Sequence, residues 1–373
     1  TMASRAQYRS LQEMREPPFT PTDREAKGTA PGAKSGLKGG TIMGLAELSG
    51  PGEQRRMAIS ASNRPVEVVD YPTQAPSRHN SDKLAQSQKD DRGYGTNWFA
   101  NGQTRCFAVG STDLYAMIWR TLRRVNHDDY SVAAERKLEA GETFRSIALA
   151  PGGPLFAMVG VADPPAEEPS GLRRDDDSRV IHVLDPLTLA TTTTKAQQFA
   201  GGYGASGPLL VVVGDELFVA GQSKLGADEE EQMGCINVFS TGPADELVRE
   251  IRGEWRQAKD MVAMDGRLYL LEDNEGVYPR HSPEVAAKKA AAGMKIFVIS
   301  TEGVTLEVLD LKSQPSAERP YLPPRETTGE KDSWGVSCIE PFDGKLVVCI
   351  HRKRAFGARP GDLKMVWLEH TGE

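Results

Sequence analysis

Two glycine-rich segments have a residue spacing that could bind the phosphates of a cofactor. Gly202–Gly207 matches the G-x-G-x-x-G spacing of a dinucleotide site, which needs a strand before the glycines and a helix after them. Pro208 and the β-type run Leu209–Val213 follow instead. A second segment, Gly28–Ser35, approaches the P-loop pattern, but an alanine separates its last glycine from its lysine. We therefore predict that neither segment cradles phosphate and that the chain binds no cofactor.

Histidine and serine residues form no catalytic or metal-binding constellation in the sequence. The six histidines never stand at the spacing of metal ligands, and they are His79, His127, His182, His281, His351 and His370. No G-x-S-x-G elbow surrounds a serine. We interpret His182 as a hydrogen-bonded strand residue and His127–Asp129 as a turn. The sequence thus predicts no catalytic, cofactor-binding or metal-binding residue, and a protein that is not an enzyme.

Two groups of basic side chains are the candidates for partner binding. One group lies near each end of the chain: Arg5, Arg9, Arg15, Arg24, Lys27, Lys34 and Lys38, and then Arg352, Lys353 and Arg354. Charge runs of this kind are often no more than solvated loops. The net charge of the whole chain is −7, whereas a nucleic-acid platform is usually basic. We therefore favour protein subunits as partners, with RNA as an alternative.

A strand-turn-strand pattern recurs along the chain and indicates the β-strands on which the candidate residues would be placed. Its second strand carries Leu followed by an aromatic or aliphatic residue, in Asp113–Met117, Pro154–Met158, Glu216–Val219, Arg267–Leu270 and Lys345–Val348. Four of these strands follow a turn dipeptide: Gly152-Gly153, Gly214-Asp215, Asp265-Gly266 and Asp343-Gly344. Such dipeptides supply the positive φ angles of two-residue hairpin turns. Each unit is therefore expected to begin with a β-hairpin.

The units continue with further strands after a variable insertion. A third strand of matching pattern occurs four times, in Ile181–Val183, Ile236–Val238, Ile296–Val298 and Met365–Trp367. The alternating segment Gly303–Leu309 is typical of a half-exposed fourth strand. Repeated four-stranded units predict an all-β fold, a β-propeller. We favour six blades, with five or seven as alternatives.

These hairpins resemble the blades of WD40-like, kelch-like and lactonase-like propellers over about residues 95–373. The resemblance implies the architecture and no particular family, because no unit carries the Gly-His and Trp-Asp pair of true WD40 repeats. In propellers of this kind, the loop between the second and third strands opens on one common face. Insertions at that loop indicate a docking face, and they are Asp163–Ser178, Gln222–Gly234, Glu272–Gly293 and His351–Gly361.

The domain organisation predicted from composition is an extended N-terminal arm, residues 1–42, followed by a propeller, residues 43–373, with a polar loop at 77–92. The arm is rich in Pro, Gly, Ser and charged residues and cannot bury a core of its own. A partner surface would order it, and wrapping on its own propeller is the alternative. The last unit lacks a fourth strand, and we expect one of Thr41–Leu48, Arg56–Ala61 or Val66–Tyr71 to complete it.

Composition sets the remaining expectations. Apolar runs are too short for a membrane span, so we expect a soluble protein. Four dispersed cysteines, Cys106, Cys235, Cys338 and Cys349, favour free thiols in a reducing, intracellular compartment.

The leading hypothesis for function is a non-catalytic scaffold subunit of a larger macromolecular assembly, anchored by its arm and docking through its insertion loops. Two alternatives stay open. One is a lactonase-like hydrolase or small-ligand binder that uses the central channel, for which Asn97, Glu254, Asp260 and Asp332 are roughly placed. The other is an RNA-contacting accessory subunit of a ribonucleoprotein.

Overall fold

A computed structural model of the 373-residue chain is described for the residues that form its strands and tight turns. The described residues are 8–15, 42–49, 55–61, 67–71, 107–118, 120–139, 142–161, 179–197, 209–222, 234–243, 246–255, 258–273, 294–311, 333–353 and 363–370. Within these ranges the chain forms strands and turns and no helix, which confirms the all-β prediction. The same ranges hold no helix long and apolar enough to cross a bilayer.

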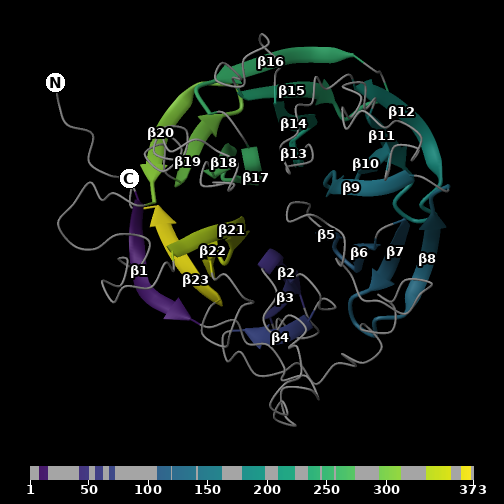
Figure 1. Ribbon diagram of the computed structural model, residues 1–373. Coiled ribbons are helices and arrows are strands. Elements are labelled where there is room, and N and C mark those ends of the chain that lie inside the picture. Colours follow the sequence, from purple (N-terminus) through teal and green to yellow (C-terminus); the bar gives the residue numbers. More distant parts are fainter. Residues whose placement is uncertain are drawn as a thin grey trace, which may run out of the picture.

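The strands form six antiparallel sheets arranged as the blades of a propeller (Figure 1). Blade 1 holds β2 (Ile42–Ser49), β3 (Arg55–Ala61) and β4 (Glu67–Tyr71). Blade 2 holds β5 (Phe107–Val109), β6 (Asp113–Ile118), β7 (Thr121–Asn126) and β8 (Val132–Lys137). Blade 3 holds β9 (Glu142–Leu149), β10 (Leu155–Val161), β11 (Arg179–Leu184) and β12 (Thr191–Gln197).

The second half of the ring repeats the pattern. Blade 4 holds β13 (Leu209–Val213), β14 (Glu216–Gln222), β15 (Gly234–Ser240) and β16 (Leu247–Gly253). Blade 5 holds β17 (Ala258–Met264), β18 (Arg267–Asp273), β19 (Met294–Ser300) and β20 (Thr305–Asp310). Blade 6 holds β21 (Ser333–Phe342), β22 (Lys345–Lys353), β23 (Leu363–His370) and β1 (Tyr8–Arg15). The structure therefore has five four-stranded blades and, in blade 1, a sheet of three described strands.

The core of the molecule is divided among the interfaces between blades. Six clusters of buried apolar side chains occur, and each joins residues of two neighbouring blades, including blade 6 with blade 1. The innermost strands β2, β5, β9, β13, β17 and β21 contact one another in turn around the centre. Each blade can therefore bury its faces only against its neighbours, which is the reason for closing the ring.

The predicted tight turns are confirmed at three of the four dipeptides. Val213 pairs with Glu216, Met264 with Arg267, and Phe342 with Lys345, so that only two residues connect each pair of strands. Positive φ angles occur at Gly214, at both residues of Asp265-Gly266 and at both residues of Asp343-Gly344. The prediction was wrong for Gly152-Gly153, because Leu149 pairs with Leu155 and the amide of Ala150 donates to the carbonyl of Pro154, which makes a longer turn.

The strand that completes blade 6 differs from the sequence expectation. The strands β2, β3 and β4 pair with one another in blade 1, so none of them closes the ring. Instead β1 pairs with β23, with Tyr8 opposite His370 and Arg15 opposite Met365. Eight residues of the predicted arm thus form the outer strand of the last blade. The signal was missed because YRSLQEMR carries no sustained apolar run and its partner lies at the far end of the chain.

Cationic side chains connect each of blades 1 to 4 to a turn of the next blade. Four of them donate to main-chain oxygens across a blade interface: Arg56 Nη1 to His127 O (2.8 Å), Arg136 Nη1 to Leu189 O (3.0 Å), Lys195 Nζ to Gly242 O (3.0 Å) and Arg249 Nη2 to Thr301 O (2.8 Å). Arg56 and Lys195 are fully buried. Because a buried charge is tolerated only when it is hydrogen-bonded, these contacts fix the angle between blades as well as their spacing.

Replacement of Lys195 tests this role. In a Lys195→Met variant the buried apolar stem is kept but the carbonyl of Gly242 loses its donor, and an unsatisfied buried acceptor costs about 1–3 kcal/mol. We expect the free energy of unfolding to fall by that amount. Lys137→Met, at an exposed lysine on the outer strand of the preceding blade, is the matched control and should leave it unchanged. Equal effects of the two substitutions in chemical denaturation would contradict the assignment.

Candidate functional site

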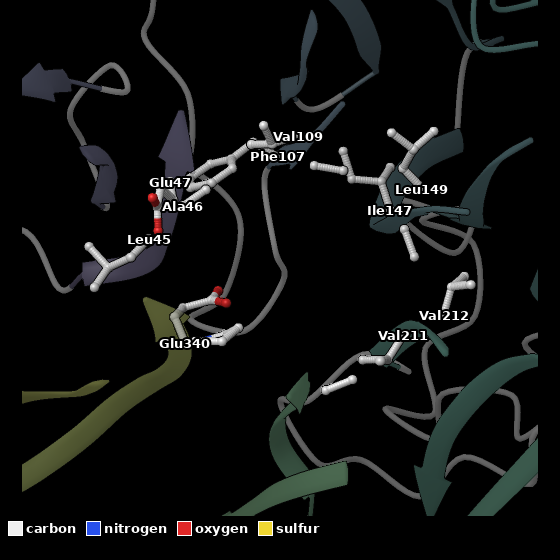
Figure 2. A pocket seen from close by; sticks show the side chains of 14 residues that line it. Leu45, Ala46, Glu47, Phe107, Val109, Ile147, Leu149, Val211, Val212 and Glu340 are labelled. Carbon is white, nitrogen blue, oxygen red and sulfur yellow. The ribbon is translucent and has the colours of Figure 1, made fainter. Parts of the chain in front are cut away.

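A cavity lies in the central channel of the ring, between the innermost strands (Figure 2). Its volume is about 270 Å³, and all six innermost strands contribute to its wall. The lining is mostly aliphatic, with one aromatic ring and two carboxylates: Leu45, Ala46, Glu47, Phe107, Ala108, Val109, Ile147, Ala148, Leu149, Val211, Val212, Ala263, Glu340 and Pro341. These described lining residues include no Ser, Thr, Cys, His, Lys or Arg. Glu47 and Glu340 are the ionisable side chains among these lining residues.

The two channel carboxylates have identifiable structural contacts. Glu47 accepts from Arg55 Nε at 3.3 Å and from the amide of Asp343 at 3.4 Å, which joins blade 1 to blade 6. Glu340 is buried on β21, and its Oε1 lies 3.2 Å from the place where a Cβ on Gly44 would be. A glycine at position 44 thus leaves room for the carboxylate. Across the described ranges, no group of three His, Cys, Asp or Glu side chains could hold a metal ion.

The residues that the sequence suggested for a channel site serve other purposes where they are described. Asp260 lies on β17 and is 5% exposed. Its Oδ1 accepts from the amide of Met261 and its Oδ2 from the amide of Ile339 on β21, both at 2.8 Å, so the carboxylate links blades 5 and 6. Glu254 follows the outer strand β16 and is exposed. Asn97 and Asp332 lie outside the described residues.

His182 and His127 lie in a strand and in a turn, in agreement with their interpretation from the sequence. His182 lies on β11 with Nδ1 3.1 Å from Arg136 Nη2, and burial followed by the nearby guanidinium lowers its pKa. His127 occupies the turn after β7, where its carbonyl accepts from Arg56. Burial also lowers the pKa of His127. Both rings are therefore neutral at neutral pH, and neither lines the channel.

The basic residues proposed for partner binding are partly brought together in blade 6. Arg9 and Arg15 lie on β1, opposite Glu369 and Met365, while Arg352 and Lys353 are the last residues of β22. Arg15 and the end of β22 belong to the same end of this blade, at which residues 354–362 connect β22 to β23. Arg5, Arg24, Lys27, Lys34, Lys38 and Arg354 lie outside the described residues.

The predicted insertions connect the second and third strands of blades 3, 4, 5 and 6. Because the strands of every blade are antiparallel, these connections share one face of the ring, which we call the insertion face. The tight hairpin turns and the turns before each fourth strand lie on the opposite face, the turn face. Most residues of the insertions lie outside the described ranges.

A group of exposed aliphatic side chains on the outer strands was not predicted from the sequence. We call it the outer strip, and it comprises Leu247 (48% exposed) and Val248 (51%) on β16 together with Val304 (60%), Leu306 (51%) and Val308 (44%) at β20. The alternation in Gly303–Leu309 correctly indicated a strand. It did not show that Leu306 and Val308 on one face of that strand are exposed, while Leu309 on the opposite face is buried against blade 6.

Comparison with known proteins supports the fold. No protein-family model and no curated protein sequence matches this chain. Among solved structures, Raptor of Chaetomium thermophilum is 11% identical with a TM-score of 0.51, and the match covers 91% of this chain and 24% of Raptor. The chain thus spans about a quarter of that protein.

Two further matches have lower TM-scores. The β-propeller domain of Myceliophteria thermophila Cps50 (Swd1) is 12% identical, with a TM-score of 0.42 and coverage of 89% of this chain and 97% of that domain. A luciferin-regenerating enzyme is 9% identical, with a TM-score of 0.46 and coverage of 89% and 92%. At these identities the likeness concerns architecture alone. The chain is a β-propeller built mainly of four-stranded blades.

Proposed function

We propose that the protein is a non-catalytic interaction subunit of a larger assembly and that its partners are proteins. The observation that carries the proposal is the outer strip, in which large aliphatic side chains of two neighbouring blades are 44–60% exposed. Contiguous apolar surface is characteristic of protein-binding sites. The strip lies on the outside of a ring whose blade interfaces are already filled by buried clusters, so these side chains are not needed for closing the ring.

The chemistry of the described residues supports a protein partner over the two alternatives. The two carboxylates among the described residues of the channel wall have structural surroundings, Glu47 in contacts with Arg55 and Asp343 and Glu340 buried beside Gly44. Three carboxylates lie between Ser300 and Leu311, beside the outer strip, with Lys295 and Arg249 as their described basic neighbours. An excess of acidic over basic side chains disfavours the phosphates of RNA. The basic residues of blade 6 remain candidates for a second contact of the same assembly.

We also propose a reducing, intracellular compartment for this subunit. Cys338 on β21 and Cys349 on β22 are direct cross-strand partners, and both are buried free thiols. Their burial raises the pKa of Cys338 well above the usual thiol range, so the reactive thiolate is disfavoured. These two facing thiols would stay reduced in a compartment in which disulfides seldom form.

Native size-exclusion chromatography tests the assembly proposal. In an extract of the cells that make this protein, we expect the chain to elute in a complex several times larger than its own 40.6 kDa. The purified chain alone is the control and should elute as a monomer. Elution of the chain from fresh extract as a free monomer at moderate salt would contradict the proposal.

A further inference from the structure

The exposed aliphatic side chains of blade 5 stand out when equivalent positions of the outer strands are compared. The register of β8, β12, β16 and β20 aligns two outward-facing positions in each strand. Both are exposed in every blade, and they hold Ala133 and Glu135 in blade 2, Thr192 and Thr194 in blade 3, Val248 and Glu250 in blade 4, and Leu306 and Val308 in blade 5. Only blade 5 of these four places two large aliphatic side chains there. The fold itself accepts small or polar residues at both positions.

Blades 4 and 5, which carry the two parts of the strip, contact each other near their outer strands. The turn before β20 rests on β16, because Arg249 Nη2 donates to the carbonyl of Thr301 at 2.8 Å. In the same turn, a Cβ on Gly303 would lie 3.0 Å from the side chain of Ile251. Arg249 is held in place by an ion pair with Glu216. The turn that carries Val304 therefore packs against the strand that carries Leu247 and Val248, on the face that holds Arg249 and Ile251.

The strand β20 is also the outermost described strand of its sheet, whose order is β17-β18-β19-β20 (Figure 1). Only one edge of β20 is paired within the described part of the chain, with β19. An outer edge presents main-chain donors and acceptors that can pair with an added strand. The register of the β19–β20 pair shifts between Val298 and Ile299, at the start of β20, and is regular from Glu307 to Asp310. That regular stretch is long enough to pair with a short extended peptide.

Acidic side chains outnumber basic ones around this edge. Glu302, Glu307 and Asp310 lie between Ser300 and Leu311, while Lys295 is opposite Asp310 and Arg249 is near Glu302. Hydrogen bonds from the main chain and from the hydroxyls of Ser300 and Thr301 lower the pKa of the exposed Glu302, so this carboxylate is ionised at neutral pH. A second copy of this chain would bring the same acids against one another, and like charges across a strand pair are destabilising. A basic partner is complementary.

We propose that β20 is a β-augmentation site, where a partner protein adds an extended segment that alternates aliphatic and basic residues. This inference rests on the proposed function and names the chemistry of the partner. The aliphatic side chains of the segment pack on Leu306 and Val308, and a basic side chain of the segment lies near the exposed Glu302. Its main chain pairs with the outer edge of β20.

A defined peptide tests the proposal with the full-length chain. The probe is a short, fluorescently labelled peptide that alternates lysine and valine, and its control has glutamate in place of lysine. Fluorescence anisotropy should show binding of the lysine peptide with a Kd on the order of 10–100 µM, weakened by salt, and no binding of the glutamate peptide. The double variant Leu306→Thr and Val308→Thr copies the threonines of blade 3 and should weaken binding at least about tenfold.

Two control variants keep the test decisive. Val132→Thr changes an exposed valine at the start of β8 and should bind the peptide as the wild type does. Glu302→Lys should weaken binding of the lysine peptide without altering the aliphatic residues. Since all these positions are exposed, thermal unfolding should be unchanged in each variant.

Three results would overturn the proposal. The first is that the wild type does not bind the lysine peptide. The second is that Val132→Thr weakens peptide binding as much as the double threonine variant does. The third is that the chain associates with itself and that the double threonine variant abolishes this association. If the peptide fails to bind while the chain still elutes in a large complex, the augmentation site is wrong and the interaction role stands. If the chain is a monomer in extract, the interaction role itself fails.

Discussion

Deletion of residues 1–15 is expected to lower the free energy of unfolding by several kcal/mol and to broaden the unfolding transition. These residues include β1, which pairs with β23 and supplies the fourth strand of blade 6. Each backbone hydrogen bond contributes about 1 kcal/mol net, so loss of a whole ladder is large compared with the 5–15 kcal/mol of a typical domain. It also uncovers Trp367 and Leu368, which are buried on β23 beside this strand.

The measurement is denaturant unfolding followed by tryptophan fluorescence. Deletion of residues 1–7, which lie before β1, is the matched control and should leave the midpoint close to that of the wild type. Identical midpoints for the two deletions would show that β1 does not close the ring. The result also bears on the hypothesis of an anchoring arm, because a deletion that removes β1 impairs folding and association together. Substitutions within residues 16–41 would separate these two effects.

Substitution of Gly253 by alanine is expected to destabilise the protein by about 3–5 kcal/mol, as much as the loss of a buried tryptophan. Gly253 and Gly234 are a direct cross-strand pair on β16 and β15. The ring of Trp255 lies against both, and a Cβ on Gly253 would fall 1.7 Å from Cζ3 of that ring. Trp255 is fully buried and contacts Phe297 of blade 5 edge-on, with ring centroids 5.8 Å apart. The ring therefore cannot move aside without opening the interface.

Gly214→Ala separates this steric effect from a general effect of glycine replacement. Gly214 has a φ of 60° in its hairpin turn, and a Cβ there would meet no atom within 4 Å. We expect a cost of about 1–2 kcal/mol, which reflects only the left-handed backbone conformation. Chemical denaturation of the two variants provides the comparison. If Gly253→Ala proved no more harmful than Gly214→Ala, the packing of Trp255 against this glycine pair would be contradicted.

The hairpins of the blades could be predicted because their signals are local. A turn dipeptide such as Asp265-Gly266 lies directly between the strands that it connects, and the third strands repeat the same apolar pattern. Trp255 is buried in the cluster between blades 4 and 5.

The features that escaped prediction depend on contacts that periodicity does not encode. The pairing of Tyr8 with His370 joins opposite ends of the chain, and β1 has no apolar run to mark it. Alternation in β20 gave the period of the strand but not which of its faces points outward. Likewise, the inter-blade bond of Lys195 to Gly242 arises between a strand and a turn of different units. Aligning the fourth strands by register would have revealed the aliphatic residues of blade 5.

Hydrogen–deuterium exchange on the native assembly tests the interaction role most directly. Amide exchange would be compared between the isolated chain and the chain within its purified complex. Our account predicts slower exchange in β20 (Thr305–Asp310) and in the first residues of β16, with β12 (Thr191–Gln197) unchanged as the equivalent polar strand. Unchanged exchange in β16 and β20, together with protection confined to the channel strands β2 and β21, would contradict it.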